Sequence, residues 1–318
     1  MKISCMIAWG LGLRFMTSKN RSFYSKVLLF GEYSVIKDSM ALATPYPMFE
    51  GRLTFNAEKK VDQELKSFAE YLHHLPKEEW SCVHFDVRLF EMEVLEGLYF
   101  ESTIPQGYGV GSSGALVAAV FDRYAKNADE LAHDIFRLKK IFSIMESHFH
   151  GSSSGIDPLI TYLNTPMLIK DKSTMGPTVL PQLPKGEGAL FIINTARPRK
   201  TEPLVNLFLE KCRQAEFSHL LHNVLTPITN GCITSFLSGD TITLYEHFRE
   251  LSDFQYRHFG PMIPKLYRGL WRDGLKDEDY YLKLCGAGGG GFLLGMTKDF
   301  NRASKVLAQY EVRSLFSL

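Results

Sequence analysis

A glycine-rich loop is the feature that most constrains how this chain can fold. It spans Pro105–Ala115, and its three alternating glycines, Gly107, Gly109 and Gly111, lead directly into Ser112 and Ser113. A strand-like stretch at residues 97–103 precedes the loop, and an apolar run at residues 115–120 follows it at helical spacing. Glycines let the backbone approach a phosphate closely, and the N–H groups at the start of a helix then face that phosphate. The pattern therefore predicts an anion site, with Ser112 or Ser113 capping the helix.

Two common phosphate-binding motifs do not fit this loop. In the dinucleotide motif GxGxxG the third glycine would come one residue later, and in the P-loop motif GxxxxGK[ST] a lysine would follow the last glycine. A plain glycine-rich turn before a helix would give the same pattern. The loop alone therefore leaves both interpretations open.

The composition is that of an ordinary globular protein. Of its 318 residues, 45% are hydrophobic and 22% are charged, and the net charge is +1 with no basic block. These values favour neither a nucleic-acid partner nor a membrane surface. The five cysteines form no CxxC pair, which argues against a zinc site or a disulfide scaffold and indicates a reducing cytoplasm.

The first residues do not have the pattern of a membrane segment. Residues 5–15 are apolar, but the run is too short to span a bilayer, and Gly10, Gly12 and Arg14 interrupt it. No small-residue cleavage site follows a clean apolar core, so a secretory signal is not indicated. We expect residues 1–20 to be either a disordered extension or a mis-assigned one, with Met16 as the true start.

Hydrophobic periodicity predicts an α+β fold with a mixed sheet. Strands are expected at residues 26–31, 40–44, 51–55, 83–89, 98–103, 167–170, 189–194, 280–284 and 292–294. Helices are expected at residues 61–75, 113–125, 129–147, 202–237, 241–254, 262–271 and 301–310, with a loop at residues 150–158. A Pro/Gly-rich stretch at residues 176–188 marks the expected boundary between an N-terminal, phosphate-binding domain at residues 21–180 and a C-terminal domain at residues 181–318.

Three separated motifs resemble those of the GHMP kinase family (galacto-, homoserine, mevalonate and phosphomevalonate kinases). The first is Lys26–Val35, the second is the loop at Pro105–Ala115, and the third is Lys283–Gly291, which contains a second glycine loop. The motifs occur in the family's order and span nearly the whole chain, which makes the resemblance far more specific than any one of them. It implies an N-terminal domain like that of ribosomal protein S5 and a ferredoxin-like C-terminal domain.

Within the family, the chain is most similar to the mevalonate kinases. The similarity lies in Glu146, in the segment His150–Asp157 that follows it, and in Asn194–Arg199 after a predicted strand. It implies transfer of a phosphoryl group from ATP, with Mg²⁺, to mevalonate, a small hydroxy acid. The product would be 5-phosphomevalonate for isoprenoid precursor synthesis, and a homodimer is left open.

The resemblance also implies roles for individual residues. The phosphates would contact Gly107, Gly109, Val110, Gly111, Ser112, Ser113 and Gly114. Mg²⁺ would be held by Ser113 and by Glu146, and Asp157 would accept the hydroxyl proton with Lys26 beside it. The acceptor would be bound by Glu32, Tyr33, Thr195, Arg197, Gly288 and Gly289.

The charged residues of this set also have plainer interpretations. Asp157 precedes Pro158 and could belong to an Asp-Pro turn, and Lys26 could be a strand-end lysine that reaches solvent. Glu146 could be a solvated residue near a helix end.

Two other functions stay open on the sequence alone. One is a GHMP kinase that acts on phosphomevalonate or a sugar; a phosphorylated acceptor would need further cations, for which Arg197, Arg199 and Lys200 are candidates. The other is a non-catalytic protein that binds ATP and an effector as a sensor, although a sensor would have no use for a general base.

Tyr33 stands where mevalonate kinases usually have a histidine. This difference affects the acceptor pocket more than the phosphate site.

Overall fold

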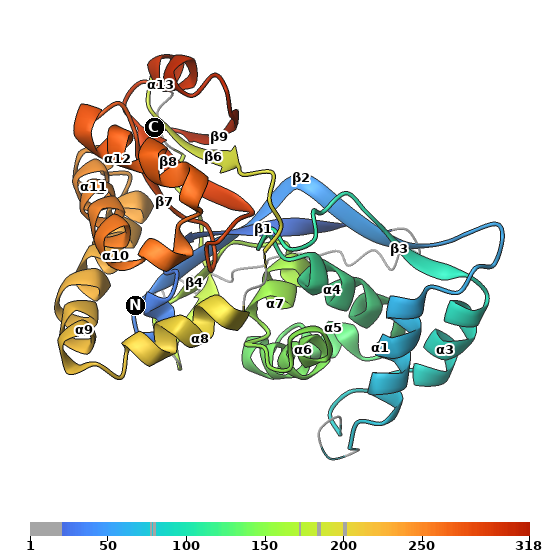
Figure 1. Cartoon of the computed structure of the whole chain (residues 1–318). Coiled ribbons are helices and arrows are strands. Elements are labelled where there is room, and N and C mark those ends of the chain that lie inside the picture. The colour runs from blue at the N-terminus through green and yellow to red at the C-terminus, as the bar shows by residue number, and fades with distance from the viewer. Residues whose placement is uncertain (1–20, 77, 79–80, 172, 183–185, 200–201) are drawn as a thin grey trace, which may run out of the picture.

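The computed structural model describes residues 21–76, 78, 81–171, 173–182, 186–199 and 202–318. The expectation for residues 1–20 lies outside these ranges. Within them the chain forms two sheets, one from each half of the sequence, with helices packed around them (Figure 1). The α+β class is confirmed, but the expected mixed sheet is wrong, because every strand pairing that the structure describes is antiparallel. None of the helices in these ranges has the length and apolar character needed to cross a bilayer.

The first sheet is built on one long strand. Its members are β1 (Phe23–Phe30), β2 (Ala41–Phe55), β3 (Leu98–Ser102), β4 (Met167–Ile169) and β5 (Met175–Pro177), and β2 pairs with β1, β3 and β4. The two strands predicted at residues 40–44 and 51–55 are the ends of β2. Pro47 does not end the strand, because the β1–β2 pairing shifts register there, and such irregularities tolerate proline.

Among the described residues of the first half of the chain, six helices and one 3₁₀ turn surround this sheet. They are η1 (Ser34–Lys37), α1 (Gln63–His73), α3 (Val87–Leu95), α4 (Ser112–Tyr124), α5 (Ala128–Leu131), α6 (Ile135–His150) and α7 (Ile156–Leu163). Helices α4 and α7 pack on β1 and β2, as Figure 1 shows, and so bring their N-terminal ends to the first strand.

Local capping explains two errors in the predicted elements. The strand predicted at residues 83–89 is wrong, because the Asp86 side chain accepts the Leu89 N–H and begins α3. The single helix predicted at residues 129–147 is also wrong, because Asp134 accepts the Arg137 N–H and begins α6 after the short α5. Such N-caps satisfy helical N–H groups that otherwise have no intrahelical partner.

The second sheet contains β6 (Ala189–Asn194), β7 (Tyr281–Leu284), β8 (Phe292–Thr297) and β9 (Glu311–Ser317) in the order β7-β8-β6-β9. This order and the helices between the strands are those of a ferredoxin-like domain. The helix predicted at residues 301–310 ends early, as α13 (Phe300–Val306), and the chain then returns as β9. Half-exposed β9 pairs with β6 at the edge of the sheet, so its sequence carries only a weak apolar signal.

A helical layer connects β6 to β7. It contains α8 (Glu202–Lys211), α9 (Ala215–Leu220), η2 (Leu221–Leu225), α10 (Thr226–Ser238), α11 (Thr241–His258), η3 (Gly260–Met262), η4 (Lys265–Tyr267) and α12 (Arg268–Asp277). The helix predicted at residues 202–237 is broken at residues 212–214, and the helix predicted at residues 262–271 is instead the end of η3, the turn η4 and the start of α12.

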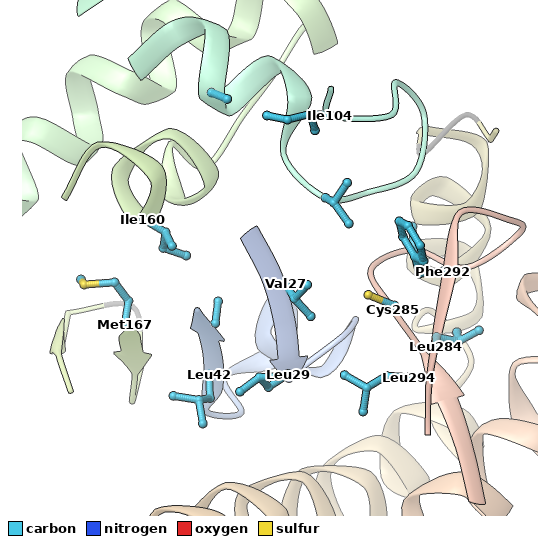
Figure 2. Close-up of a cluster of buried hydrophobic side chains, with 14 of the residues drawn as sticks. Val27, Leu29, Leu42, Ile104, Ile160, Met167, Leu284, Cys285, Phe292 and Leu294 are labelled. Atoms are coloured by element: carbon cyan, nitrogen blue, oxygen red, sulfur yellow. The ribbon is translucent and has the colours of Figure 1, made fainter. Parts of the chain in front are cut away.

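The hydrophobic core is continuous between the two sheets. Figure 2 shows Val27 and Leu29 of β1 between side chains of the first sheet, such as Leu42, and side chains of the second, such as Leu294. All four are fully buried members of one cluster. Strand β1 therefore lies where the two halves meet, and residues on it and just after it can contact both.

Candidate active site

The first glycine loop is fixed between β1 and the start of α4. Gly107, Gly109 and Gly111 have positive φ angles of 76°, 75° and 83°. The Lys26 N–H donates to the Val110 carbonyl at 2.9 Å, which holds the loop against β1. Gly111 is the residue before the helix and makes no side-chain cap, so the predicted Ser112 or Ser113 cap is wrong. The N-terminal N–H groups of α4 are thus left for another acceptor.

Lys26 and Asp157 form an ion pair beside this loop. The Nζ of Lys26 lies 2.8 Å from Oδ2 of Asp157; the lysine side chain is 7% exposed and the aspartate 37% exposed. Lys26 is therefore not a strand-end lysine that reaches solvent. Asp157 keeps enough exposure to meet a ligand.

The position of Asp157 depends on two glycines. A Cβ atom on Gly114 of α4 would lie 2.9 Å from the Pro158 nitrogen and 3.1 Å from the Asp157 Cβ, so only glycine lets α4 and α7 approach this closely. Gly155 precedes α7 with φ 72° and lies against the backbone of α6. Asp157 and Pro158 belong to the first turn of α7, where proline is tolerated, and the loop predicted at residues 150–158 is wrong for this part.

Glu146 forms a polar cluster with residues of three segments. Its Oε1 accepts the Ser113 hydroxyl at 3.0 Å, and its Oε2 accepts the Ser153 hydroxyl. The Ser113 Oγ also lies 2.9 Å from Nε2 of His150. Glu146 is only 4% exposed, so it is not a solvated helix-end residue.

The surroundings of Glu146 change its titration. Burial raises the pKa of Glu146 to about 7, and the charge of Asp157 adds to the rise, whereas Ser153, Ser113 and Lys26 oppose it. A carboxylate and a hydroxyl are hard oxygen ligands, and Mg²⁺ in proteins keeps several waters and takes few protein oxygens. Ser113 and Glu146 fit such an ion, which would hold the carboxyl in its ionised form.

His150 was not assigned a role from the sequence, although its position could have been found. It stands four residues after Glu146, so the two side chains share one face of α6. In the described part of the chain, no group of three or more His, Cys, Asp or Glu side chains could hold a metal.

The turn after β1 is directed into the protein. Glu32 forms an ion pair with Lys283 of β7 in which the two side chains are 1% and 0% exposed. Burial raises the pKa of Glu32, although the charge and hydrogen bond of Lys283 lower it. Tyr33 has φ 63°, donates its hydroxyl to the Ala287 carbonyl at 2.5 Å, and packs on aromatic rings of the helical layer. The polar groups of both residues thus join β1 to the second glycine loop.

The second glycine loop lies against the first. The Thr195 N–H and hydroxyl both donate to the Gly291 carbonyl, at 2.9 and 2.7 Å. The Gly289 N–H donates to the Met262 carbonyl at 2.5 Å, and a Cβ on Gly288 would collide with that same carbonyl. A Cβ on Gly291 would collide with the carbonyl of Tyr108. The second glycine loop therefore contacts the first loop through Gly291, to which Thr195 is hydrogen-bonded, while acceptor binding by Thr195, Gly288 and Gly289 stays a prediction.

Two arginines of the connection after β6 have different positions. Arg197 is exposed, and its carbonyl accepts the Gly291 N–H at 2.7 Å. Arg199 is half-buried, and its N–H donates to the Gly107 carbonyl at 2.9 Å. From the sequence, Arg197 was predicted to contact the acceptor and Arg199 was only a candidate for an additional cation; Lys200 lies outside the described residues.

Comparisons with known proteins agree with this architecture. Residues 72–164 match the family described as GHMP kinases N terminal domain. The L. major mevalonate kinase, solved in complex with R-mevalonate, is 18% identical with a TM-score of 0.62, over 91% of this chain and 90% of that chain. The chain has the GHMP kinase fold. A comparison with curated proteins finds no match.

Other solved structures with the GHMP kinase fold contain different bound acceptors. Streptococcus pneumoniae phosphomevalonate kinase, in complex with phosphomevalonate and AMPPNP, is 13% identical with a TM-score of 0.61, over 93% of this chain and 98% of that chain. Lactococcus lactis galactokinase, complexed with galactose, is 14% identical with a TM-score of 0.64, over 93% and 92% of the two chains. Similarity at these identities establishes the fold, and the acceptor has to be inferred from the site.

The segment that matches the GHMP kinase N-terminal domain contains the first glycine loop, Glu146 and Asp157. Lys26 and the second glycine loop lie outside that segment. Lys26 lies next to the matched segment because β1 lies between the two halves of the chain. The second glycine loop, between β7 and β8, lies next to it because Gly291 packs on Tyr108. The fold thus brings together side chains and loops that are far apart in sequence.

Proposed function

We propose that this protein is an ATP-dependent small-molecule kinase that phosphorylates mevalonate to 5-phosphomevalonate in isoprenoid precursor synthesis. The observation that carries the proposal is the Lys26–Asp157 ion pair, which lies beside a glycine loop and a helix N-terminus in a chain with the GHMP kinase fold. Phosphoryl transfer to an alcohol needs bound phosphates, neutralised charge and an acceptor for the hydroxyl proton. The described residues can meet each of these needs.

The phosphates are proposed to bind along Gly107–Gly114. The glycines with positive φ leave the backbone open, and the free N–H groups at the start of α4 favour an anion. Ser113 and Glu146 would hold Mg²⁺, which supplies positive charge to the phosphates of ATP. Gly111 has to remain small, because a Cβ there would lie 3.0 Å from the Cγ of Lys26.

Asp157 is proposed to accept the proton of the attacking hydroxyl. Its side chain is 37% exposed, so an acceptor can reach it, and Nζ of Lys26 lies 2.8 Å from its Oδ2. As the hydroxyl oxygen bonds to the terminal phosphorus of ATP, its proton moves to Asp157 and ADP leaves. Lys26 then lies close to the charge that develops on the transferring group. A sensor without catalysis would have no need for this pair.

The acceptor is proposed to lie between Asp157 and the second glycine loop. Thr195, Gly288 and Gly289 are proposed to border this side, and Glu32 and Tyr33 would support it through their contacts with β7 and Ala287. Arg197 is proposed as a further acceptor contact, although its side chain is exposed. The choice of mevalonate rests on the motifs around Glu146–Asp157 and on the similarity to mevalonate kinase structures.

An acceptor panel tests the proposal. Purified protein with Mg²⁺ and ATP is assayed for ADP release with mevalonate, phosphomevalonate or galactose, and the phosphorylated product is identified by mass spectrometry. We expect turnover with mevalonate that falls by about 10²–10⁴-fold in Asp157→Ala. If the wild-type protein forms no acceptor-dependent ADP above the level of this variant, the kinase proposal is wrong. Turnover with galactose alone would keep the kinase and exclude mevalonate.

A further inference from the structure

Arg199 lies at the junction of the two glycine loops. Its N–H is bonded to Gly107 of the first loop, and a Cβ on Gly109 would collide with its Nη2. A Cβ on Gly286, at the start of the second loop, would lie 2.7 Å from the same Nη2. The aliphatic part of the side chain runs along Gly289 and Gly290. The guanidinium therefore enters the cleft through space that exists only because these positions are glycine.

The guanidinium lies between the two glycine loops, on the side where the acceptor is proposed to bind. Its Nη2 is next to Gly109 of the first loop and to Gly286 at the start of the second. The Cβ and Cδ atoms of the same side chain lie beside Gly289. Arg199 therefore belongs to the part of the site that the second glycine loop forms.

A partly desolvated guanidinium in such a position suits a particular ligand. Its planar N–H groups match the two oxygens of a carboxylate or the oxygens of a phosphate, and the match is stronger away from water. A neutral sugar offers hydroxyls but no charge, so it would form no ion pair with this guanidinium. The surroundings of Arg199 thus favour an acidic acceptor.

We propose that Arg199, rather than Arg197, binds the anionic group of the acceptor and selects acidic alcohols over neutral ones. This proposal rests on the proposed kinase function and specifies the substrate class of the same site. Arg199 would act as a specificity-determining residue that touches substrate, while Lys26 and Asp157 perform the transfer. A carboxylate and a phosphate are both compatible with it, and the acceptor panel separates them.

The test compares two acceptors that differ only in charge. Mevalonate is paired with 3-methylpentane-1,3,5-triol, in which a hydroxymethyl group replaces the carboxylate. In Arg199→Gln we expect KM for mevalonate to rise about 10- to 100-fold, with KM for ATP unchanged, because charge-assisted hydrogen bonds are lost. KM for the triol should change less than about twofold, since a ligand without the anion makes no such bonds with Arg199. Arg199→Lys should be intermediate, because it keeps the charge and loses the planar fork.

Several controls keep the outcomes distinct. Arg197→Gln tests the competing assignment, Arg52→Gln is a surface control, and thermal melting checks that each variant is folded. Calorimetric binding of mevalonate, with Mg²⁺ and a non-hydrolysable ATP analogue, gives a readout that does not depend on turnover. Equal losses for mevalonate and the triol, a rise in KM for ATP instead, or a loss in Arg197→Gln alone would each overturn the assignment of Arg199. If the wild-type protein phosphorylates none of the acceptors, the kinase function itself fails; activity with galactose alone refutes only the acidic acceptor.

Discussion

Lys283→Met should strongly destabilise the folded protein, because it leaves Glu32 as a buried carboxylate without its cation. Both side chains are almost completely excluded from solvent, at 0% and 1% exposure, and Lys283 also donates to the Leu284 carbonyl at 2.7 Å. The second carboxylate oxygen, Oε2, has no hydrogen-bond partner among the described residues. Removing one partner of such a pair costs about 3–5 kcal/mol. Glu32→Gln combined with Lys283→Met should recover much of this loss, because no charge is then left behind.

The loss of stability caused by Lys283→Met should depend on pH. Burial already raises the pKa of Glu32 in the wild-type protein, and removing Lys283 takes away the group that opposes this rise. The Glu32 carboxyl group then keeps its proton in the folded state at pH values where it has lost the proton in the unfolded state. The free energy of unfolding therefore falls as the pH rises above the ordinary glutamate pKa of about 4.3. We therefore expect a larger deficit at pH 8 than at pH 5.5.

Urea denaturation of the full chain at both pH values measures these effects. Arg52→Met provides a matched control, because Arg52 pairs with Glu101 at 2.7 Å but both side chains are about half exposed, at 51% and 49%. That exposed pair should contribute less than about 1 kcal/mol. If Lys283→Met is no more destabilising than Arg52→Met, or if its deficit is larger at pH 5.5 than at pH 8, the reasoning about a buried and costly charge is refuted.

Three further predictions concern the cleft. Asp157→Ala should lower kcat by about 10²–10⁴-fold and leave ATP affinity measured by calorimetry nearly unchanged; a near-normal kcat would exclude a general base. Ser113→Ala and Glu146→Gln should each raise the Mg²⁺ concentration at half-maximal rate, and unchanged titrations in both would exclude the metal site. Tyr33→Phe should lower stability in urea by about 1 kcal/mol, since the Ala287 carbonyl loses its donor, with KM for mevalonate unchanged. A large rise in KM would instead mean that the hydroxyl contacts the acceptor.

The strongest sequence signals were local ones. The first glycine loop and α4 were predicted because positive-φ glycines and an apolar helix stand next to each other in the chain. The buried face of α6 was predicted from its periodicity, and Glu146 beside Met145 proved to be buried with it. These elements depend on contacts within a few residues, which is the information that periodicity contains.

The errors occur where distant parts of the chain decide the outcome. Strand β2 continues through Pro47 because β1 accommodates an irregular pairing there, and β9 forms because β6 offers a free edge. Neither partner is adjacent in sequence. Arg197 and Arg199 are separated by one residue in one connection, so the sequence contained no basis for choosing between them. The proposal for Arg199 depends on Gly109 and Gly286, which lie about 90 residues away on either side in the sequence and stand next to its guanidinium in the structure.

The second glycine loop shows which sequence signals bear on chemistry and which on packing. Four consecutive glycines carry a large entropic cost, so some use for them was expected. Gly291 lies against the Tyr108 carbonyl, Gly288 against the Met262 carbonyl and Gly286 against Arg199, so contacts within the protein already explain them without any ligand. In the first loop and the helix that follows, by contrast, Gly111 and Gly114 lie against the charged pair Lys26–Asp157. A glycine-rich segment therefore indicates phosphate chemistry only where its glycines lie beside reactive side chains. The proposed kinase function depends on the Lys26–Asp157 ion pair and not on the number of glycines.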